Sequence, residues 1–599
     1  MPKPHSDPRT VLTETFGYAE FRGQQENIIT HVTEGGSCCV LMPTGSGKSL
    51  CYQIPALCRS GVGIVVSPLI ALMDDQVAAL RQLGVRAAAL HSAVPQDEQR
   101  QTREALRAGE LDLLYVAPER LMLGGFLDSL ERIEIALFAI DEAHCISQWG
   151  HDFRPEYREL SALRERFPHV PCIAVTATAD GPTRADIVEK LSLPKLFTGS
   201  FDRPNIFYGV GLKENPRTQL LRFLETRKQG ESGIVYCLSR RRVEDTAEWL
   251  RSKGFDALPY HAGLEHHVRA GNQRRFLNDE GVVMVATVAF GMGINKPDVR
   301  FVAHLDLPKN IEAYYQETGR AGRDGLPATA WMVYGINDVV QLRGMIDDGE
   351  GPEEQKRVER TKLELLLSYC EAPRCRRQTL LAYFGDACEP CNNCDTCLEP
   401  PETFDGTVAA QKLLSCIYRT GERFGAVYVI NVLLGTDDER IKRLGHDQLS
   451  TFGIGKDHSD REWRGVLRQL MVHGLVEADS DAYGALRLTD AGATFLRERQ
   501  SLELRIDARP KPKRKSAVRT DAVLDDEADN ELLKRLKAER MAIAREQNVP
   551  PYVIFHDRTL VDMVRAGATT LRELAALNGV GQTKLERYGE RFVEILRAG

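Results

Sequence analysis

The stretch CCVLMPTGSGKS, residues 38–49, decides the fold of the first half of the chain. Its apolar part CCVL predicts a buried strand, and a helical stretch follows the glycine-rich turn. The glycines permit a tight loop whose backbone N–H groups surround phosphate groups, with Lys48 reaching the phosphates and Ser49 ligating Mg²⁺. The predicted phosphate-binding residues are Thr44, Gly45, Ser46, Gly47, Lys48 and Ser49. Met42 replaces the first glycine of the strict pattern, so a glycine-rich surface turn remains the alternative.

Short apolar strands alternate with helical stretches from this loop to about Val333. Continuous apolar strands interleaved with helices are typical of parallel sheets that are covered on both faces. Two such sets occur, before and after residues 201–205, so we predict two α/β domains. The expected strands are CCVLM, GIVVSP, LDLLYVAP, IALFAIDEAH, CIAVTATA, GIVYCLS, VVMVATV and RFVAHLD.

A pair of carboxylates ends one of these strands, in the sequence AIDEAH. We expect Asp141 to hold the Mg²⁺ shell and Glu142 to polarise the attacking water. The alternative is a solvated strand end, but such an end rarely shares a chain with a phosphate loop in this order.

Two arginines lie in the second α/β domain, within YYQETGRAGRDG, residues 314–325. Arg320 and Arg323 are three apart, so a helix would place them on one face. A guanidinium supplied across a cleft stabilises charge on a transferred phosphate and is worth ~10³–10⁵ in rate. Placing it on a second domain would couple nucleotide hydrolysis to domain closure. The alternative is a solvated basic helix face.

Five of the 14 cysteines crowd one short stretch, and the others sit mainly in apolar segments. The set Cys375, Cys391, Cys394 and Cys397 fits a closed tetrahedral Zn²⁺ site, which is structural because no position stays open. The run Cys388-x2-Cys391-x2-Cys394-x2-Cys397 is the competing reading, an iron–sulfur ligand loop. The final spacing lacks the x3-C-P ending of such loops, which favours zinc and leaves Cys388 spare.

Length and composition describe an ordinary globular protein of several domains, with 599 residues, 43% hydrophobic and 27% charged. The formal net charge is -7, so any nucleic-acid surface must be local. We see neither a cationic-apolar leader at the start nor an apolar run long enough for a bilayer, and we expect a cytoplasmic protein without membrane contact.

The motifs together resemble superfamily 2 helicases, and specifically the RecQ family, over nearly the whole chain. DEAHCISQWGHDFRPEY is far more specific to RecQ proteins than DEAH alone. Two rivals are an RNA helicase or remodeller of another branch, which should lack the aromatic loop and the cysteines, and a DNA-binding scaffold with a vestigial motor, which should have lost motor residues. The stretches that carry the resemblance are GSGKS (45–49), SPLIALMDDQV (67–77), APERL (117–121), DEAHCISQWGHDFRPEY (141–157), TATA (176–179), IVYCLSR (234–240), ATVAFGMGINKPDVRFV (286–302) and QETGRAGRDG (316–325).

The resemblance implies roles for further residues. FGYAEFRGQQENI (16–28) is similar to the adenine-reading element, with Tyr18 stacking and Arg22 and Gln25 making polar contacts. The aromatic loop after DEAH would bind DNA and couple binding to hydrolysis, and Thr176 and Thr178 would link the two sites. The loop residues are Trp149, His151, Phe153, Arg154 and Tyr157, with packing in the core as the alternative for Trp149 and Phe153. Gln316 joins the implied catalytic set, and the four zinc ligands match Cys375, Cys391, Cys394 and Cys397.

The architecture implied is an α/β fold of two tandem RecA-like parallel-sheet domains, followed by helical zinc-binding, winged-helix (RQC) and small all-α HRDC modules. The expected ranges are 1–205, 206–342, 343–404, 405–510, a linker at 511–529, and 530–599. Winged-helix candidates for DNA contact are Arg440, Lys442, Arg443, His446, Lys456 and Arg464, although a solvated basic face is the favoured interpretation of each one taken alone. In the tail, Tyr552 and Lys584 could touch single strands, with a packing role as the alternative for Tyr552.

The activity implied is that of a DNA helicase that uses ATP, Mg²⁺ and structural Zn²⁺, moves 3′→5′ on single strands, and works in recombination, repair and SOS-type responses. The expected partners are single-stranded DNA and forked or junction duplexes, with single-stranded-DNA-binding protein as a candidate. We expect a monomer that is associated with the nucleoid.

Overall fold

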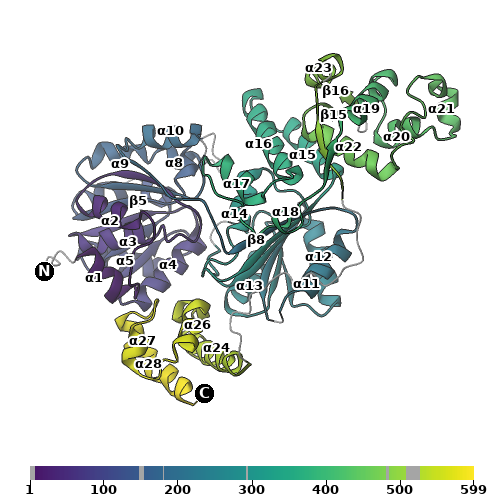
Figure 1. Cartoon of the computed structure of the whole chain (residues 1–599). Helices are drawn as coiled ribbons and strands as arrows, with labels where there is room; N and C mark the ends of the chain where they lie inside the picture. Colours follow the sequence, from purple (N-terminus) through teal and green to yellow (C-terminus); the bar gives the residue numbers. More distant parts are fainter. Residues whose placement is uncertain are drawn as a thin grey trace.

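The computed structural model describes residues 7–123, 125–147, 154–179, 181–228, 230–291, 294–479, 485–498, 500–507 and 527–598. Two α/β domains lie side by side, a mostly helical region extends from the second, and the C-terminal helices lie beneath both domains (Figure 1). The predicted linker 511–529 falls largely outside the described residues.

The first domain is built on a parallel sheet of seven described strands, in the order β3-β4-β2-β5-β6-β1-β7. The strands are β1 (Cys38–Leu41), β2 (Val62–Val66), β3 (Ala87–Leu90), β4 (Leu113–Val116), β5 (Ile135–Ile140), β6 (Cys172–Thr176) and β7 (Leu196–Thr198). Its helices include α2 (Gln25–Thr33), α3 (Leu50–Cys58), α4 (Ile70–Gln82), α5 (Gln96–Arg107), α9 (Ser161–Arg166) and α10 (Gly181–Lys190). The central strands are buried along their length because helices cover both faces.

The second domain repeats this plan with six described parallel strands, in the order β10-β11-β9-β12-β13-β8. They are β8 (Ile206–Leu212), β9 (Ser232–Tyr236), β10 (Ala257–Tyr260), β11 (Val283–Ala286), β12 (Val299–His304) and β13 (Ala328–Tyr334). Its helices include α11 (Pro216–Glu225), α12 (Arg240–Ser252), α13 (His266–Asn278) and α14 (Ile311–Thr318). All eight predicted strands are present, whereas β3, β7, β8, β10 and β13 were missed.

Helices of the zinc-binding region follow: α15 (Ile336–Asp347), α16 (Glu353–Glu371), α17 (Arg376–Tyr383) and α18 (Asp395–Leu398). The boundary predicted between residues 342 and 343 falls inside α15, which is one continuous helix.

The winged-helix region contains α19 (Thr407–Arg419), α20 (Ala426–Leu434), α21 (Glu439–Arg443), α22 (Asp460–Val472) and α23 (Asp490–Glu498). Its wing is the antiparallel pair β15 (Val476–Asp479) and β16 (Ala485–Leu488), and β14 (Thr403–Asp405) pairs with β17 (Glu503–Arg505) across its base.

The C-terminal module is helical, as its spacing predicts, with α24 (Glu527–Gln547), α25 (Pro551–Ile554), α26 (Asp557–Ala566), α27 (Leu571–Ala575) and α28 (Gln582–Arg597). Its hydrophobic core includes Leu326 of the second α/β domain, so the module packs directly on the rest of the chain.

Candidate functional site

The phosphate loop connects β1 to α3 at the carboxyl edge of the first sheet. Gly45 (φ +83°) and Gly47 (φ +81°) adopt left-handed conformations that side chains disfavour, and a Cβ on Gly47 would lie 2.5 Å from Gln25 Nε2. Lys48 Nζ donates hydrogen bonds to the carbonyl oxygens of Met42 (3.0 Å) and Pro43 (3.2 Å). The loop therefore has the predicted conformation, with its lysine held over it.

The two acidic residues Asp141 and Glu142 follow β5 directly. Glu142 has φ 47°, a strained conformation for a residue with a side chain, and such strain is concentrated at functional sites. Burial and the neighbouring Glu142 raise the pKa of Asp141 to about 7, against the opposing effect of Lys48. Burial likewise lowers the pKa of Lys48 to about 8, while both carboxylates oppose the shift. The amine and the two carboxylates therefore lie together in one site, in which Asp141 is buried and Lys48 and Glu142 are half-buried.

The predicted adenine-reading element packs on the phosphate loop. Gln25 Nε2 donates to the carbonyl oxygens of Ser46 (3.0 Å) and Gly47 (3.2 Å), and its Oε1 accepts from the Arg22 backbone N–H at 2.9 Å. The Arg22 guanidinium lies 5.9 Å from the centre of the Tyr18 ring. An amide has two donor hydrogens and two acceptor lone pairs, so a single lone pair of Gln25 remains for a base.

A chain of polar contacts leads from the carboxylates to the second domain. Glu142 Oε2 lies 3.4 Å from His144 Nδ1, which also lies 2.9 Å from Thr176 Oγ1. Thr176 Oγ1 donates to the Thr178 carbonyl at 3.0 Å, and Gln316 Nε2 donates to Thr178 Oγ1 at 2.8 Å. Sequence reasoning quoted His144 within DEAH but gave it no role.

The prediction that a helix places Arg320 and Arg323 on one face is wrong. Helix α14 ends at Thr318, and residues 319–325 form consecutive turns. Gly322 has φ +55°, and a Cβ there would meet the Leu326 carbonyl oxygen at 2.7 Å, so the chain needs this glycine to turn back.

The turns nevertheless bring Arg323 to the boundary between the domains, with Arg320 beside it. Arg323 Cγ lies 3.5 Å from the position of a Cβ on Gly45, and its Nη1 donates to Ile294 O and Asn295 Oδ1. Burial and the nearby charges of Arg320 and Arg203 lower the pKa of Arg323 to about 9. Arg320 is 6% exposed. Arg323 of the second domain therefore lies against the phosphate loop of the first, near enough for its charge to act on Lys48 and Glu142.

Of the predicted DNA-contacting loop, Trp149, His151 and Phe153 lie outside the described residues. Arg154 Nη1 donates to the Pro68 carbonyl at 3.2 Å, and the buried hydroxyl of Tyr157 donates to the Asp141 carbonyl at 3.0 Å. The C-terminal end of the loop is thus attached to the backbone that carries the acidic pair.

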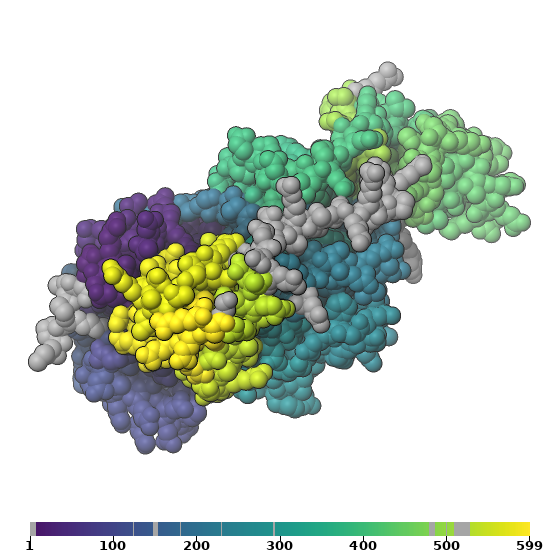
Figure 2. Space-filling model, turned by 60° about the horizontal axis from the view of Figure 1, so that its bottom comes forward, coloured from purple at the N-terminus to yellow at the C-terminus, as the bar shows by residue number. Residues whose placement is uncertain are grey.

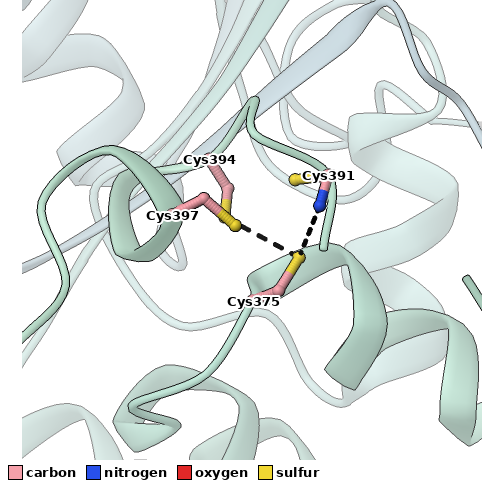
Figure 3. Close-up of side chains that lie close together, drawn as sticks. All are labelled: Cys375, Cys391, Cys394 and Cys397. Carbon is pink, nitrogen blue, oxygen red and sulfur yellow. Dashed lines mark hydrogen bonds between the residues drawn. The ribbon is translucent and has the colours of Figure 1, made fainter. Parts of the chain in front are cut away.

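Four cysteine sulfurs converge beside α17 and α18 (Figure 3). The ligand atoms of Cys375, Cys391, Cys394 and Cys397 all lie within 4.8 Å of one another, as a tetrahedral ion would require. Cys388 does not belong to this group, so the four-cysteine run of the iron–sulfur alternative is not assembled.

Several winged-helix candidates already have partners. His446 is buried, and its Nδ1 lies 2.8 Å from the Tyr428 hydroxyl. The Arg440 guanidinium lies 5.2 Å from the centre of the Tyr428 ring. Lys442 and Arg464 form exposed ion pairs with Asp437 and Asp460. Arg443 and Lys456 are exposed.

Tyr552 and Lys584, the predicted single-strand contacts of the tail, are both buried in this arrangement, at 8% and 9% exposure, so the DNA contact stays a prediction. The Tyr552 hydroxyl donates to Asp75 Oδ2 at 3.2 Å, on α4 of the first domain. Burial raises the pKa of Asp75 to about 7.

The C-terminal module contacts both α/β domains, and Figure 2 shows it (yellow) lying over the first (purple) and against the second (teal). Towards the second domain, Arg540 pairs with Glu280 at 3.1 Å. Towards the first, the Gly579 N–H donates to the Gly17 carbonyl at 2.7 Å, one residue before Tyr18.

A phosphate loop, an acidic pair and guanidinium groups that meet across a cleft between two RecA-like domains define an ATP-driven nucleic-acid motor. Models of known families match the chain in five consecutive stretches. They are the DEAD/DEAH box helicase (22–187), the helicase conserved C-terminal domain (216–325), RecQ zinc-binding (336–398), the RQC domain (400–513) and the HRDC domain (529–596).

Relatives match over almost the full length. The chain is 48% identical to an ATP-dependent DNA helicase RecQ of Pasteurella multocida, covering 98% of this chain and 93% of the relative. It is 47% identical to that of Haemophilus influenzae, covering 98% and 95%, and 39% identical to that of Bacillus subtilis, covering 98% of each. The chain belongs to the RecQ family of ATP-dependent DNA helicases.

These matches confirm the predicted fold class, activity and cofactors ATP, Mg²⁺ and Zn²⁺. The RecQ zinc-binding match, together with the four converging cysteines, decides between the two metal alternatives in favour of zinc. The family works in DNA repair and recombination, and this chain acts on DNA. None of the described helices is both long and apolar enough to cross a membrane.

Proposed function

We propose that Lys48 binds the β- and γ-phosphates of ATP, that Ser49 and Asp141 hold Mg²⁺, and that Glu142 polarises the attacking water. One observation carries this assignment: Lys48, Asp141 and Glu142 lie close together at the phosphate loop, since the charges of both carboxylates act on Lys48 and the charges of Lys48 and Glu142 act on Asp141. The phosphate loop from Thr44 to Ser49 supplies backbone N–H groups to the phosphates.

The arginines and Gln316 complete the proposed catalytic set. Arg323 and Arg320 stabilise charge on the γ-phosphate, an assignment supported by the contact of Arg323 with Gly45. Gln316 transmits the state of the nucleotide, since it bonds to Thr178 at the end of the polar chain from Glu142. Tyr18 stacks on adenine, with Arg22 and Gln25 beside it.

DNA contact is assigned to the loop that holds Trp149, His151, Phe153 and Arg154. The hydrogen bond from Tyr157, at the end of this segment, to the Asp141 carbonyl supports this assignment. Through this bond, a movement of the loop on binding DNA would also move the backbone of the acidic pair. Tyr552 joins this set only after the C-terminal module leaves its place on Asp75.

The chain is proposed to move 3′→5′ on single strands, as a monomer, and to open forked or junction duplexes in repair, recombination and SOS-type responses. Single-stranded-DNA-binding protein is a candidate partner, and the nucleoid of the cytoplasm is the proposed place of work. The proposed division of the chain is the one predicted above, with α15 kept whole, so that the third domain begins at Ile336.

The assignment is tested by comparing DNA-stimulated ATP hydrolysis of the wild type with that of Lys48→Ala. We expect a loss of at least about a hundredfold, because the lysine contacts the transferred phosphate. The exposed Lys253→Ala serves as the matched control and keeps the wild-type rate. An unchanged rate in Lys48→Ala contradicts the assignment.

Polarity is tested by strand displacement on duplexes with a 3′ or a 5′ single-stranded tail, on a fork with both, and on the RNA versions of each. We expect strand displacement from the 3′-tailed and the forked DNA, and none from the 5′-tailed DNA or the RNA versions. Displacement that requires a 5′ tail overturns the proposed direction.

A further inference from the structure

The segment that connects the two RecA-like domains is held by the zinc-binding region. The Phe201 ring stacks on Phe384 with 4.6 Å between centroids, and its backbone N–H donates to Asp386 Oδ2 at 2.8 Å. The Phe201 carbonyl accepts a hydrogen bond from the Tyr315 hydroxyl at 2.8 Å, on α14. The start of the connection is therefore fixed from two sides.

Its second half is held in the same way. Arg377 on α17 donates to the carbonyl oxygens of Pro204 (3.1 Å) and Ile206 (3.0 Å), and it forms an ion pair with Asp202 at 3.3 Å. Asn393, which lies between the ligands Cys391 and Cys394, also donates to the Pro204 carbonyl at 3.1 Å. The connection is thus an ordered part of the zinc-binding region and not a free linker.

Arg203 lies in the middle of this connection, and its side chain points into the cleft. Its Nη1 donates to the Thr44 carbonyl at 2.7 Å in the phosphate loop and to the Gly319 carbonyl at 3.0 Å. Its Nη2 donates to the carbonyl oxygens of Ala321 (2.9 Å) and Gly322 (3.0 Å). One guanidinium thereby joins the phosphate loop to the turns that carry Arg320 and Arg323.

The bonding pattern is suited to positioning. Arg203 is 9% exposed, and within the described part of the chain no carboxylate forms an ion pair with it. A buried cation with no carboxylate partner is costly, so its retention needs the carbonyl dipoles of both loops together. The planar guanidinium reaches four acceptors in fixed directions, which a lysine ammonium with its three rotating donors cannot do.

The same geometry positions Arg323, the arginine proposed to stabilise charge on the γ-phosphate. Arg203 Nη1 and Arg323 Cγ lie 3.4 and 3.5 Å from the position of a Cβ on Gly45, so both residues cover the same glycine of the phosphate loop. Asn205 supports the turn from behind, because its Nδ2 donates to the carbonyl oxygens of Gly322 (2.8 Å) and Leu326 (2.9 Å). The register of Arg323 over the phosphate loop therefore depends on the connection between the domains.

We propose that Arg203 is a positioning residue for ATP hydrolysis: it sets the distance between the phosphate loop and Arg323, and through its anchored backbone it links the zinc-binding region to the ATP cleft. This inference rests on the proposed role of Arg323. Its four hydrogen bonds all go to backbone carbonyl oxygens, so Arg203 acts through the backbone of residues 44 and 319–322.

The test uses the full chain and compares Arg203→Lys and Arg203→Ala with the wild type. We expect kcat of the DNA-stimulated reaction to fall by about tenfold to a hundredfold, because small misplacements of a catalytic group have effects of this size. Binding of a non-hydrolysable ATP analogue should weaken by less than about threefold, since the phosphate loop itself is intact. The loss should be larger for Ala than for Lys.

Arg59→Lys is the matched control. Arg59 also donates only to carbonyl oxygens, those of Ala136 (2.8 Å) and Thr33 (2.7 Å), but it lies within the first domain and away from the cleft. We expect it to lower the melting temperature while kcat stays unchanged. If Arg203→Lys behaves like Arg59→Lys, the residue is structural and the proposal is overturned.

A double-mutant cycle separates this proposal from the role of Arg323. If Arg203 acts through Arg323, the double variant Arg203→Lys/Arg323→Ala loses no more activity than Arg323→Ala alone. If the activity losses of the two single variants multiply in the double variant, the positioning role is overturned. If Arg323→Ala itself leaves kcat unchanged, the proposed function of Arg323 fails instead, and the two failures are thereby distinguished.

Discussion

Gln316 Nε2 donates a hydrogen bond of 2.8 Å to Thr178 Oγ1 across the boundary between the two RecA-like domains. Thr178 is fully buried, and its carbonyl accepts from Thr176, which in turn contacts His144 beside the acidic pair. This bond therefore connects the second domain to the polar contacts that lead to the acidic pair of the first.

Thr178→Val keeps the shape of the side chain and removes this acceptor. We expect DNA-stimulated ATP hydrolysis to stay within about twofold of wild type while duplex unwinding falls about fivefold, since one such bond is worth ~1 kcal/mol. Both rates are measured on one forked substrate. Thr246→Val, buried in α12 and bonded to Cys237 away from this chain of contacts, is the control. A parallel loss of both activities in Thr178→Val contradicts a coupling role.

The zinc assignment predicts one zinc ion for each chain and no visible absorption band in purified protein. Cys375→Ser should lose the metal, whereas Cys388→Ser should keep it, because Cys388 lies outside the converging group. Metal content is measured by atomic emission. A brown protein with a visible band, or loss of zinc in Cys388→Ser, would show that the ligand set is wrong.

Release of the C-terminal module should expose Tyr552. Glu280→Lys turns the ion pair with Arg540 into a repulsion, so we expect faster hydrogen exchange in α25 and about a twofold to tenfold gain in single-strand affinity. In the combined variant Glu280→Lys/Tyr552→Ala the gain should vanish. Glu265→Lys, exposed at the start of α13, is the matched control. A gain that survives loss of Tyr552 assigns the DNA contact to other residues.

Protonation of His556 at acid pH should destabilise the folded C-terminal module. Burial, with the charges of Lys584 and Arg540, lowers the pKa of His556 from 6.5 to about 4, against the opposing carboxylates of Asp298 and Asp557. Between pH 6.5 and 4 the His556 imidazole is protonated in the unfolded state and neutral in the folded state. The contribution of His556 to stability is therefore unchanged above pH 6.5 and falls as the pH drops from 6.5 towards 4, by up to ~1.4 kcal/mol per pH unit.

The measurement is the opening free energy of α26 amides by hydrogen exchange in the full chain, corrected for the intrinsic exchange rate at each pH. His556→Gln should flatten this slope between pH 6.5 and 4. An equal slope in both proteins would assign the acid sensitivity to other groups.

Motifs whose chemistry is local were predictable from the sequence. The phosphate loop, the acidic pair after β5 and the spacing of the four cysteines depend on neighbouring residues, so their identity already states what they bind. The strands that were missed are the less distinctive ones: β3 reads AAAL, and β10 is the half-polar ALPY with a proline. Their pairing with β4 and β11 provides the stabilisation that their own sequences do not indicate.

Relationships between distant residues were decided only by the tertiary structure. Periodicity suggested a helix for Arg320 and Arg323, but Gly319 and Gly322 end it, and the cleft brings the arginines together instead. The sequence left Tyr552 open between a DNA contact and a packing role, and only its docking on Asp75 shows that it is buried. Arg203 lay within the predicted boundary between the domains, and only the structure shows its four carbonyl partners. The physical reason is that a chain determines its local conformations through neighbours, whereas a contact between domains depends on which surfaces remain to be buried once each domain has folded.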